Sequence, residues 1–225
     1  MDAQVSRDVH TKRELKAHVW DKDPLNWYVE EPWCNSRLFD VEIFNGGVHD
    51  PCCGSGQIAA AARNAGYENV TFSDVMQRSI GEMPTWFELD HVIQDYATDP
   101  RVYDNIVTNP PFDPCNKDPY PFVEWALSHA AKKVALILPL KWLAGDKRSR
   151  WLSTKPLRRV YVLTPRPSMP PGEYLVAGNK AGGGKKDFAW FVFDRSHNSA
   201  LRSELTWLHR DGGTDDGQDH QEATP

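Results

Sequence analysis

The chain has 225 residues, enough for one domain with a full hydrophobic core. Hydrophobic residues make up 40% of it and charged residues 25%; no apolar run could span a bilayer, and the first residues lack the apolar core of a signal peptide. The four cysteines show neither a disulfide framework nor paired zinc-ligand spacing, and the eight histidines show no ligand-like spacing. We therefore expect a globular protein of the reducing cytoplasm without a metal site.

The net charge of −5 is unevenly distributed. Residues 211–225 contain acidic residues but no lysine or arginine, and they account for the whole excess of 31 acidic over 26 basic residues. That tail also lacks an apolar period, so we expect it to be disordered. Residues 1–210 are formally neutral, and charge therefore permits a nucleic-acid partner without requiring one.

The N-terminal part divides into three predicted pieces. Residues 1–23 are polar and form either a short helix around 13–19 or a loosely ordered extension. The aromatic-rich stretch 23–33 is too irregular for a helix; it either packs onto the body of the protein or forms one wall of a cofactor pocket. Residues 34–44 follow as one amphipathic helix.

A strand, a glycine turn and a helix come next. Residues 48–56 predict a short strand that breaks into a turn at Gly54 and Gly56, and an Ala-rich helix follows over 57–66. Such units bind nucleotide cofactors, because glycines let the backbone approach a ligand and the turn amides face it. Neither Gly-x-Gly-x-x-Gly nor Gly-Lys-Ser/Thr is present, which disfavours a dinucleotide or a nucleoside triphosphate. Asp50 precedes the glycines and suits a cofactor that carries a cation there.

Two more strands with acids at their ends follow. Residues 70–74 predict a second strand that ends in Asp74, which is placed to bind the hydroxyls of a ribose or, alternatively, to cap a turn or helix. Asp74 lies 24 residues after Asp50, close to the spacing of a βαβ unit. A third short strand at 91–93 leads to Asp95 and Tyr96, which could meet an adenine amine and its ring.

The stretch 104–112 is where we expect the substrate to bind. Its buried strand must stop at two prolines, which leaves Asn109, Pro110, Pro111 and Phe112 at the carboxyl end of a strand. The asparagine oxygen and a proline carbonyl can accept the N–H bonds of a planar amine-bearing ring, and Phe112 can stack on that ring. The alternative is a plain turn with Phe112 in the core.

The remaining elements complete an α/β pattern. Residues 119–132 predict a helix, and residues 134–140 are a continuous apolar run typical of a buried parallel strand. Strands at 157–163 and 187–194 bring the total to about seven, in a mostly parallel sheet flanked by helices.

Two regions beside this core are basic, and they are either solvated surface or contacts to nucleic-acid phosphates. The first spans 141–159, and the second is the Gly-rich loop 177–186. The candidates for nucleic-acid contact are Lys141, Lys147, Arg148, Arg150, Lys180, Lys185 and Lys186.

In combination, the two motifs resemble those of a known family. The sequence Asp50-Pro-Cys-Cys-Gly-Ser-Gly resembles the cofactor motif of S-adenosylmethionine-dependent methyltransferases, and Asn109-Pro-Pro-Phe resembles the catalytic motif of DNA adenine-N6 methyltransferases. The stretch 28–32 looks like the N-terminal cofactor segment of that family's gamma order. Residues 138–141 and the tracts 166–168 and 188–191 are similar to later segments of its short, phage-type members.

The resemblance implies a Rossmann-like class I methyltransferase fold whose last strand is reversed, with S-adenosylmethionine as cofactor. It divides the chain into an N-terminal extension (1–23), a catalytic domain (24–195) and a C-terminal segment (196–225). It implies methyl transfer to the N6 amine of adenine in DNA. The implied catalytic residues are Asn109, Pro110, Pro111 and Phe112. The implied cofactor-binding residues are Tyr28, Glu30, Pro32, Asp50, Pro51, Gly54, Gly56, Asp74, Asp95 and Tyr96.

The chain departs from the family in having no long segment for a separate target-recognition domain. Similar motifs also serve cytosine N4 in DNA, an RNA base or a protein glutamine amide as acceptor, because each presents a planar amine. A catalytically silent nucleic-acid-binding module on the same fold is a further alternative, disfavoured by the intact Asn109 and glycine motifs.

Overall fold

The computed structural model describes residues 26–111 and 120–212. The possible helix near 13–19, Phe112 and most of the acidic tail lie outside these ranges. The strands are β1 Val48–Asp50, β2 Val70–Asp74, β3 Val92–Ile93, β4 Tyr103–Thr108, β5 Ala130–Pro139, β6 Leu157–Thr164, β7 Phe188–Asp194 and β8 Glu204–His209. The helices are α1 Pro32–Val41, α2 Gln57–Asn64, α3 Thr85–Asp90, α4 Tyr120–His129, α5 Asp146–Leu152 and α6 Gly172–Val176, with short 3₁₀ helices η1 Tyr96–Thr98 and η2 Leu140–Ala144.

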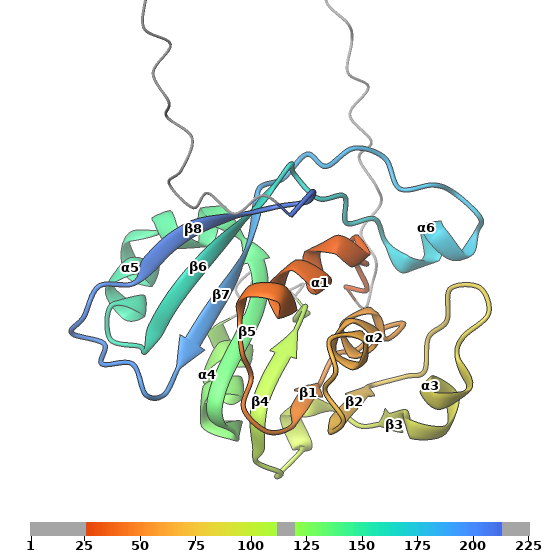
Figure 1. The fold of residues 1–225 in the computed structure, drawn as a ribbon, viewed down its shortest axis with the longest axis horizontal. Helices are drawn as coiled ribbons and strands as arrows, with labels where there is room; N and C mark the ends of the chain where they lie inside the picture. Colours follow the sequence, from red (N-terminus) through yellow and green to blue (C-terminus); the bar gives the residue numbers. More distant parts are fainter. Residues whose placement is uncertain (1–25, 112–119, 213–225) are drawn as a thin grey trace, which may run out of the picture.

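The eight strands of the described residues form one sheet in the order β3-β2-β1-β4-β5-β7-β6-β8 (Figure 1). Strands β3, β2, β1, β4 and β5 are mutually parallel, and β7 runs antiparallel to both β5 and β6. The prediction of an α/β fold with a mostly parallel sheet is confirmed. The reversed strand is β7, the last of the predicted strands, whereas the last strand observed, β8, is parallel to β6. Because β1, β2 and β4 are parallel, their carboxyl ends meet at one edge of the sheet.

The sheet has one strand more than the predicted seven. Strand β8 pairs in parallel with β6, from Arg159 opposite Glu204 to Thr164 opposite His209. Glu204, Leu205 and Trp207 of this strand are exposed, Thr206 and His209 are half-buried, and Leu208 is buried in the core. The C-terminal segment therefore contributes an edge strand beyond residue 195.

Two predicted helices have different bounds in the structure. Helix α1 begins at Pro32, because proline fits the first position of a helix, and it ends at Val41 instead of residue 44. Helix α4 ends at His129, where we predicted residue 132, because β5 already begins at Ala130. Pairing of Ala130 and Lys133 with β4 draws those residues into the sheet.

The core consists of one apolar layer on each face of the sheet. Alternating residues of β5 divide between the layers: Ala135 and Ile137 pack with α1 and α2, whereas Leu136 and Leu138 pack with α4 and α5. Figure 1 shows α1 and α2 in front of the sheet. Within the described residues, no helix is both long and apolar enough to cross a bilayer.

Candidate active site

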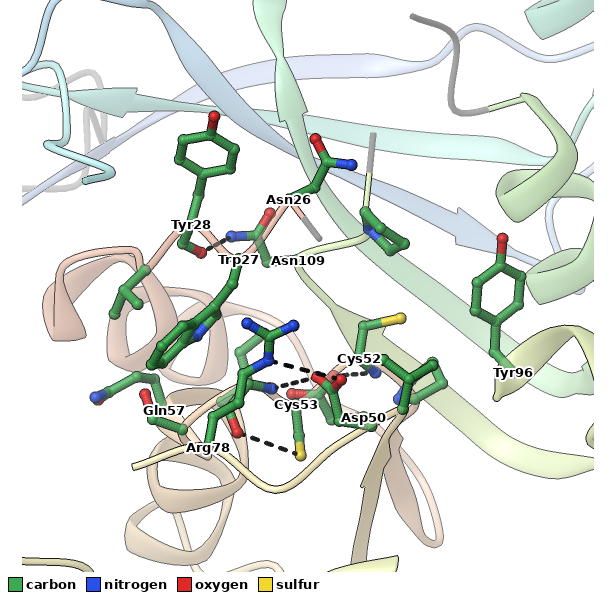
Figure 2. A pocket seen from close by; sticks show the side chains of 18 of the residues that line it. Asn26, Trp27, Tyr28, Asp50, Cys52, Cys53, Gln57, Arg78, Tyr96 and Asn109 are labelled. Atoms are coloured by element: carbon green, nitrogen blue, oxygen red, sulfur yellow. Dashed lines mark hydrogen bonds and ion pairs between the residues drawn. The ribbon is translucent and has the colours of Figure 1, made fainter. Parts of the chain in front are cut away.

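A pocket of about 360 Å³ lies at the carboxyl ends of β1, β2 and β4 (Figure 2). Of the predicted site residues, it is lined by Tyr28, Glu30, Asp50, Pro51, Gly54, Asp74, Asp95, Tyr96, Asn109 and Pro111. Three residues of the predicted pocket-wall stretch, Asn26, Trp27 and Val29, also line it. The other lining residues were not named as site residues: Cys52, Cys53, Ser55, Gln57, Ile58, Val75, Arg78 and Ala97. In Figure 2, Trp27 and Arg78 lie on one side of the pocket and Tyr96 on the other.

Three of the predicted cofactor-binding or catalytic residues do not line the pocket, and a fourth lies outside the described residues. Pro32 is the first residue of α1, and Gly56 is the N-cap of α2. Pro110 is buried in the turn that follows β4. Phe112 lies outside the described residues, so its stacking role stays a prediction.

The glycine turn, residues 51–56, requires its glycines for both conformation and space. Gly54 has φ +50° and Gly56 has φ +76°, in the left-handed region that favours glycine. A Cβ on Gly54 would lie 2.7 Å from Nε1 of Trp27, and one on Gly56 would lie 2.5 Å from the Phe87 ring. The turn is thus packed closely between the N-terminal loop and α3, which explains why no larger residue fits.

The acid at the end of β2 is tied to this turn. Oδ2 of Asp74 accepts a hydrogen bond of 2.9 Å from the Gly54 amide. Its Oδ1 lies 4.0 Å from Nε of Arg78, whose guanidinium stacks 4.8 Å from the centre of the Trp27 ring. Arg78 is only 8% exposed. No motif pointed to this arginine, because it reaches the pocket from the connection after β2.

Asp50 is a carboxyl group in an unfavourable place for a negative charge. It is 2% exposed, and its Oδ1 accepts a hydrogen bond of 3.2 Å from the Cys52 amide. Burial raises the pKa of Asp50 well above its ordinary value, against the opposing effects of the Thr108 hydroxyl and the Cys52 amide. A cation bound beside this group would favour its ionised form.

The two cysteines of the turn are unsuited to nucleophilic catalysis. Burial, reinforced by the nearby charges of Asp50 and Asp74, raises the pKa of the Cys52 and Cys53 thiols well above the ordinary value. The thiolate is the reactive form, so both side chains act as neutral pocket walls.

Asn109 is held from behind by the N-terminal loop, residues 26–31. Its Nδ2 donates two hydrogen bonds of 3.0 Å, one to the Tyr28 carbonyl and one to Oε2 of Glu30. The other oxygen of Glu30, Oε1, accepts a hydrogen bond of 2.9 Å from Nδ2 of Asn35 in α1. The structure thereby joins the predicted catalytic asparagine to a segment 79 residues earlier in the chain.

The N-terminal loop is itself fixed to the body. The Val29 amide donates to the Pro170 carbonyl at 2.9 Å, and the Gly172 amide donates to the Trp27 carbonyl at 2.8 Å. Trp27 is buried yet also lines the pocket. The described part of the aromatic stretch therefore packs onto the body and also lines the pocket, and its role in holding a cofactor stays a prediction.

Asp95 and Tyr96 line the pocket where η1 begins. Oδ1 of Asp95 accepts a hydrogen bond of 2.9 Å from the Ala97 amide and so caps this short helix. The Tyr96 ring packs edge-on against Phe122 and Trp125, with centroid separations of 4.7 and 5.1 Å.

The structure separates the basic residues into two groups. Lys155, Arg158 and Arg159 form ion pairs with Glu124, Glu204 and Glu42. Among the candidates for nucleic-acid contact, Arg148 donates to the Trp142 carbonyl and exposed Arg150 pairs with Asp146. The exposed candidates are Lys141, Lys147, Arg150, Lys180, Lys185 and Lys186.

Two stretches of this exposed set are brought together. A hydrogen bond of 2.9 Å from the Leu140 amide to the Asp187 carbonyl joins the start of η2 to the end of the loop 177–187, here called the lysine loop. Helix η2 follows β5, and the lysine loop precedes β7. Both therefore lie at the edge of the sheet where β4 ends and Asn109 follows. Within the described residues, no group of histidine, cysteine or acidic side chains could hold a metal ion.

Comparisons with known proteins define the fold class. No protein-family model matches the chain, and no curated protein matches it. A proposed RNA methyltransferase from Pyrococcus horikoshii superposes with a TM-score of 0.50 and 19% identity, over 72% of this chain and 81% of that one. A modification subunit of a proposed type I restriction enzyme from Vibrio vulnificus YJ016 gives 0.53 and 14%, over 80% of this chain and 46% of that one. The chain has the Rossmann-like fold that such methyltransferases share.

Proposed function

We propose that this protein transfers a methyl group from S-adenosylmethionine to the exocyclic N6 amine of adenine in DNA. The observation that carries the proposal is the orientation of Asn109 at the pocket. Both donor bonds of its amide nitrogen run to the Tyr28 carbonyl and Glu30, so its oxygen is left as the acceptor for a substrate amine.

The pocket residues fit S-adenosylmethionine. Asp74 ends β2, where an acid can bind ribose hydroxyls, and Gly54 of the glycine turn lines the pocket beside it. Buried Asp50 would be stabilised by the cationic methionine end of the cofactor. Tyr96, Asp95 and neighbouring Val75 offer a wall for the adenine ring.

When bound, S-adenosylmethionine supplies an electrophilic methyl group: the amine nitrogen forms a bond to that carbon while the carbon–sulfur bond breaks and its electrons pass to sulfur. The protein's task is to make a weak nucleophile attack in line. The Asn109 oxygen, which lies at the pocket, accepts one N–H bond of the amine, and we expect the Pro110 carbonyl to accept the other, although Pro110 itself does not line the pocket. Two such acceptors direct the lone pair of the amine away from them. The extra proton then leaves to water. Phe112 is expected to stack on the base.

In duplex DNA the adenine has to leave the stack before it can reach Asn109. The exposed lysines of the lysine loop and Lys141, at the same edge of the sheet, are suited to the phosphates that flank a flipped base. Cytosine N4, an RNA base and a protein glutamine amide would offer a planar amine to the same acceptors, and experiment decides among them.

The proposal is tested by incubating the protein with methyl-labelled S-adenosylmethionine and, in parallel, unmethylated genomic DNA, total RNA or a protein extract. We expect label in DNA and little in the other two. Label found only in RNA or only in protein would retain methyl transfer but reject the DNA acceptor. Label in none of them, from a protein that binds the cofactor, would reject the catalytic proposal and favour the binding module.

A further inference from the structure

Glu30 is a buried acid whose two oxygens are both used. It is 6% exposed, and its partner Asn35 is fully buried. Oε1 accepts from Nδ2 of Asn35 at 2.9 Å, and Oε2 accepts from Nδ2 of Asn109 at 3.0 Å. The carboxylate therefore bridges two asparagine amides, one in α1 and one after β4.

The backbone around Glu30 holds this bridge in place. The amide of the preceding residue, Val29, donates to the Pro170 carbonyl, and the backbone carbonyl of the following residue, Glu31, accepts a hydrogen bond of 2.9 Å from the Cys34 amide in the first turn of α1. Helix α1 begins at Pro32 and positions Asn35 within its first turn. The carboxylate is thus fixed from both sides, so it can restrict the group that it contacts.

An asparagine amide has two nearly isosteric orientations, and hydrogen bonding decides between them. Behind Asn109, both contacts are acceptors: the Tyr28 carbonyl and the Glu30 carboxylate. Rotating the amide by 180° would place its oxygen against two other oxygens.

We propose that Glu30 is a positioning residue, held by Asn35, that orients the Asn109 amide so that its oxygen receives the substrate amine. This role differs from the cofactor contact that the sequence resemblance implied for Glu30. Its catalytic consequence rests on the proposed function, whereas the orientation of Asn109 can be measured without turnover.

The test exchanges the carboxyl group of Glu30 and the amide group of Asn35 between the two positions. In Glu30→Gln, one of the two asparagine NH₂ groups must face the glutamine NH₂. In Asn35→Asp, two carboxylates face each other in a buried site. In the double variant, the glutamine NH₂ donates to Asp at position 35 while its oxygen accepts from Asn109, so both hydrogen bonds return. Glu31→Gln is the matched control, because the neighbouring Glu31 bonds Ser168 and Arg210 and does not line the pocket.

Three readouts separate the outcomes: the side-chain amide NMR resonances of Asn109, assigned through Asn109→Ala; the dissociation constant for S-adenosylmethionine; and kcat for methyl transfer. We expect each single exchange to shift the Asn109 resonances and to lower kcat on the order of 10- to 100-fold, the scale of a displaced catalytic group. Cofactor affinity should change little, the double variant should recover, and Glu31→Gln should resemble the wild type.

The proposal would be overturned if Glu30→Gln weakened cofactor binding and left the Asn109 resonances unmoved, or if the double variant failed to restore them while folding normally by circular dichroism. If the single Asn35→Asp variant does not fold, Glu30→Gln and the double variant still decide. A wild-type protein that methylates no acceptor would reject the proposed function, but the NMR comparison would still report whether Glu30 orients Asn109.

Discussion

At the scale of single residues, the site combines acceptor groups for an amine with acids for a cationic cofactor. Asn109 offers a carbonyl oxygen whose amide nitrogen is already bonded to Tyr28 and Glu30. Asp50 and Asp74 lie on the neighbouring strands β1 and β2. The two functions therefore depend on different residues, and substitutions should separate them.

Asn109→Ala removes the amine acceptor but leaves the glycine turn and Asp74 intact. We expect methyl transfer to fall by about 100-fold or more, the scale seen when one oriented polar group of a catalytic site is removed. Calorimetric titration with S-adenosylmethionine should give nearly the wild-type dissociation constant. A variant that loses cofactor binding instead would count against the assignment of Asn109 to the acceptor.

Asp50→Asn should stabilise the folded protein at neutral pH. Because burial raises the pKa of Asp50 above 3.8, the unfolded chain releases this proton at a lower pH than the folded protein does. Between those two values, the free energy of unfolding of the wild type therefore falls as pH rises. Asp50→Asn does not lose this stability, so its free energy of unfolding at pH 7 should exceed that of the wild type. The difference is on the order of 1 kcal/mol for each unit by which the pKa of Asp50 is raised.

Urea unfolding of the wild type and Asp50→Asn at pH 3 and pH 7 measures this effect. The stability advantage of the variant should be larger at pH 7 and shrink toward pH 3, while its affinity for S-adenosylmethionine is reduced at pH 7. An advantage that is the same at both pH values would show that the Asp50 charge is not the cause.

At the scale of elements, the pocket depends on how the N-terminal loop sits between α6 and the glycine turn. Trp27 is the contact on both sides: it packs on Gly54, and Gly172 at the start of α6 packs on its ring. Small residues on each side thus allow one buried indole to close the pocket wall.

Gly172→Ala should displace this indole, because a methyl group there would lie 2.1 Å from a Trp27 ring carbon. Gly172 has no left-handed backbone angle, so the effect would come from crowding alone. We expect a loss of about 1–3 kcal/mol in the free energy of unfolding and weaker cofactor binding. Gly178→Ala would be a poor control because its φ is +79°, whereas Gly183→Ala, with open space around it, should leave both quantities unchanged.

His49, at the contact between β1 and β4, makes the free energy of unfolding depend on pH. Burial lowers the pKa of His49 to about 3, while its ring bonds Thr71 at 2.9 Å and stacks on Tyr103 at 3.7 Å. As pH falls below 6.5, the unfolded chain takes up a proton that the folded protein does not, so stability decreases by up to about 1.4 kcal/mol per pH unit.

The His49→Gln variant lacks this pH-dependent contribution, because glutamine does not titrate. The difference in free energy of unfolding between wild type and His49→Gln should therefore shift in favour of the variant as pH is lowered from 7 to 5, measured by urea denaturation. A difference that stays constant over this interval would mean that His49 is protonated equally in both states.

At the scale of the whole molecule, exposed Lys141 and the lysine loop lie at the same edge of the sheet as Asn109, although the chain as a whole is acidic. Replacing Lys180, Lys185 and Lys186 together by alanine should weaken DNA binding. The slope of log affinity against log salt should decrease in magnitude by about 0.9 for each phosphate that the variant no longer neutralises. Lys155→Ala is the control, because Lys155 pairs with Glu124 at 2.8 Å; an equal effect there would argue against a specific role for the lysine loop.

Sequence patterns predicted most strands of the sheet, and also the glycine turn and Asn109 of the site. Continuous apolar runs mark β5 and β7 because those strands are buried on both faces, and the glycine turn and Asn109 are local motifs. Strand β8 was missed because an edge strand with exposed Leu205 and Trp207 has no such run. The end of α4 was misjudged because strand pairing, which helical periodicity does not contain, decides residues 130–133.

The walls of the pocket could not be predicted in the same way. Arg78 stacks on Trp27, and Glu30 connects Asn35 with Asn109, through contacts that arise only when distant segments pack together. A resemblance assigns Glu30 to a segment but does not identify its hydrogen-bond partners. Those partners give the acid the orienting role that we propose.

The most direct test of the proposed function is identification of the modified nucleoside. Wild type and Asn109→Ala would each be incubated with unmethylated genomic DNA and S-adenosylmethionine carrying a deuterated methyl group, and the digested DNA analysed by mass spectrometry. We predict deuterated N6-methyladenine from the wild type and about 100-fold less or below detection from the variant. Deuterated N4-methylcytosine in its place, equal product from both proteins, or unmodified DNA from a wild type that binds the cofactor would contradict the account.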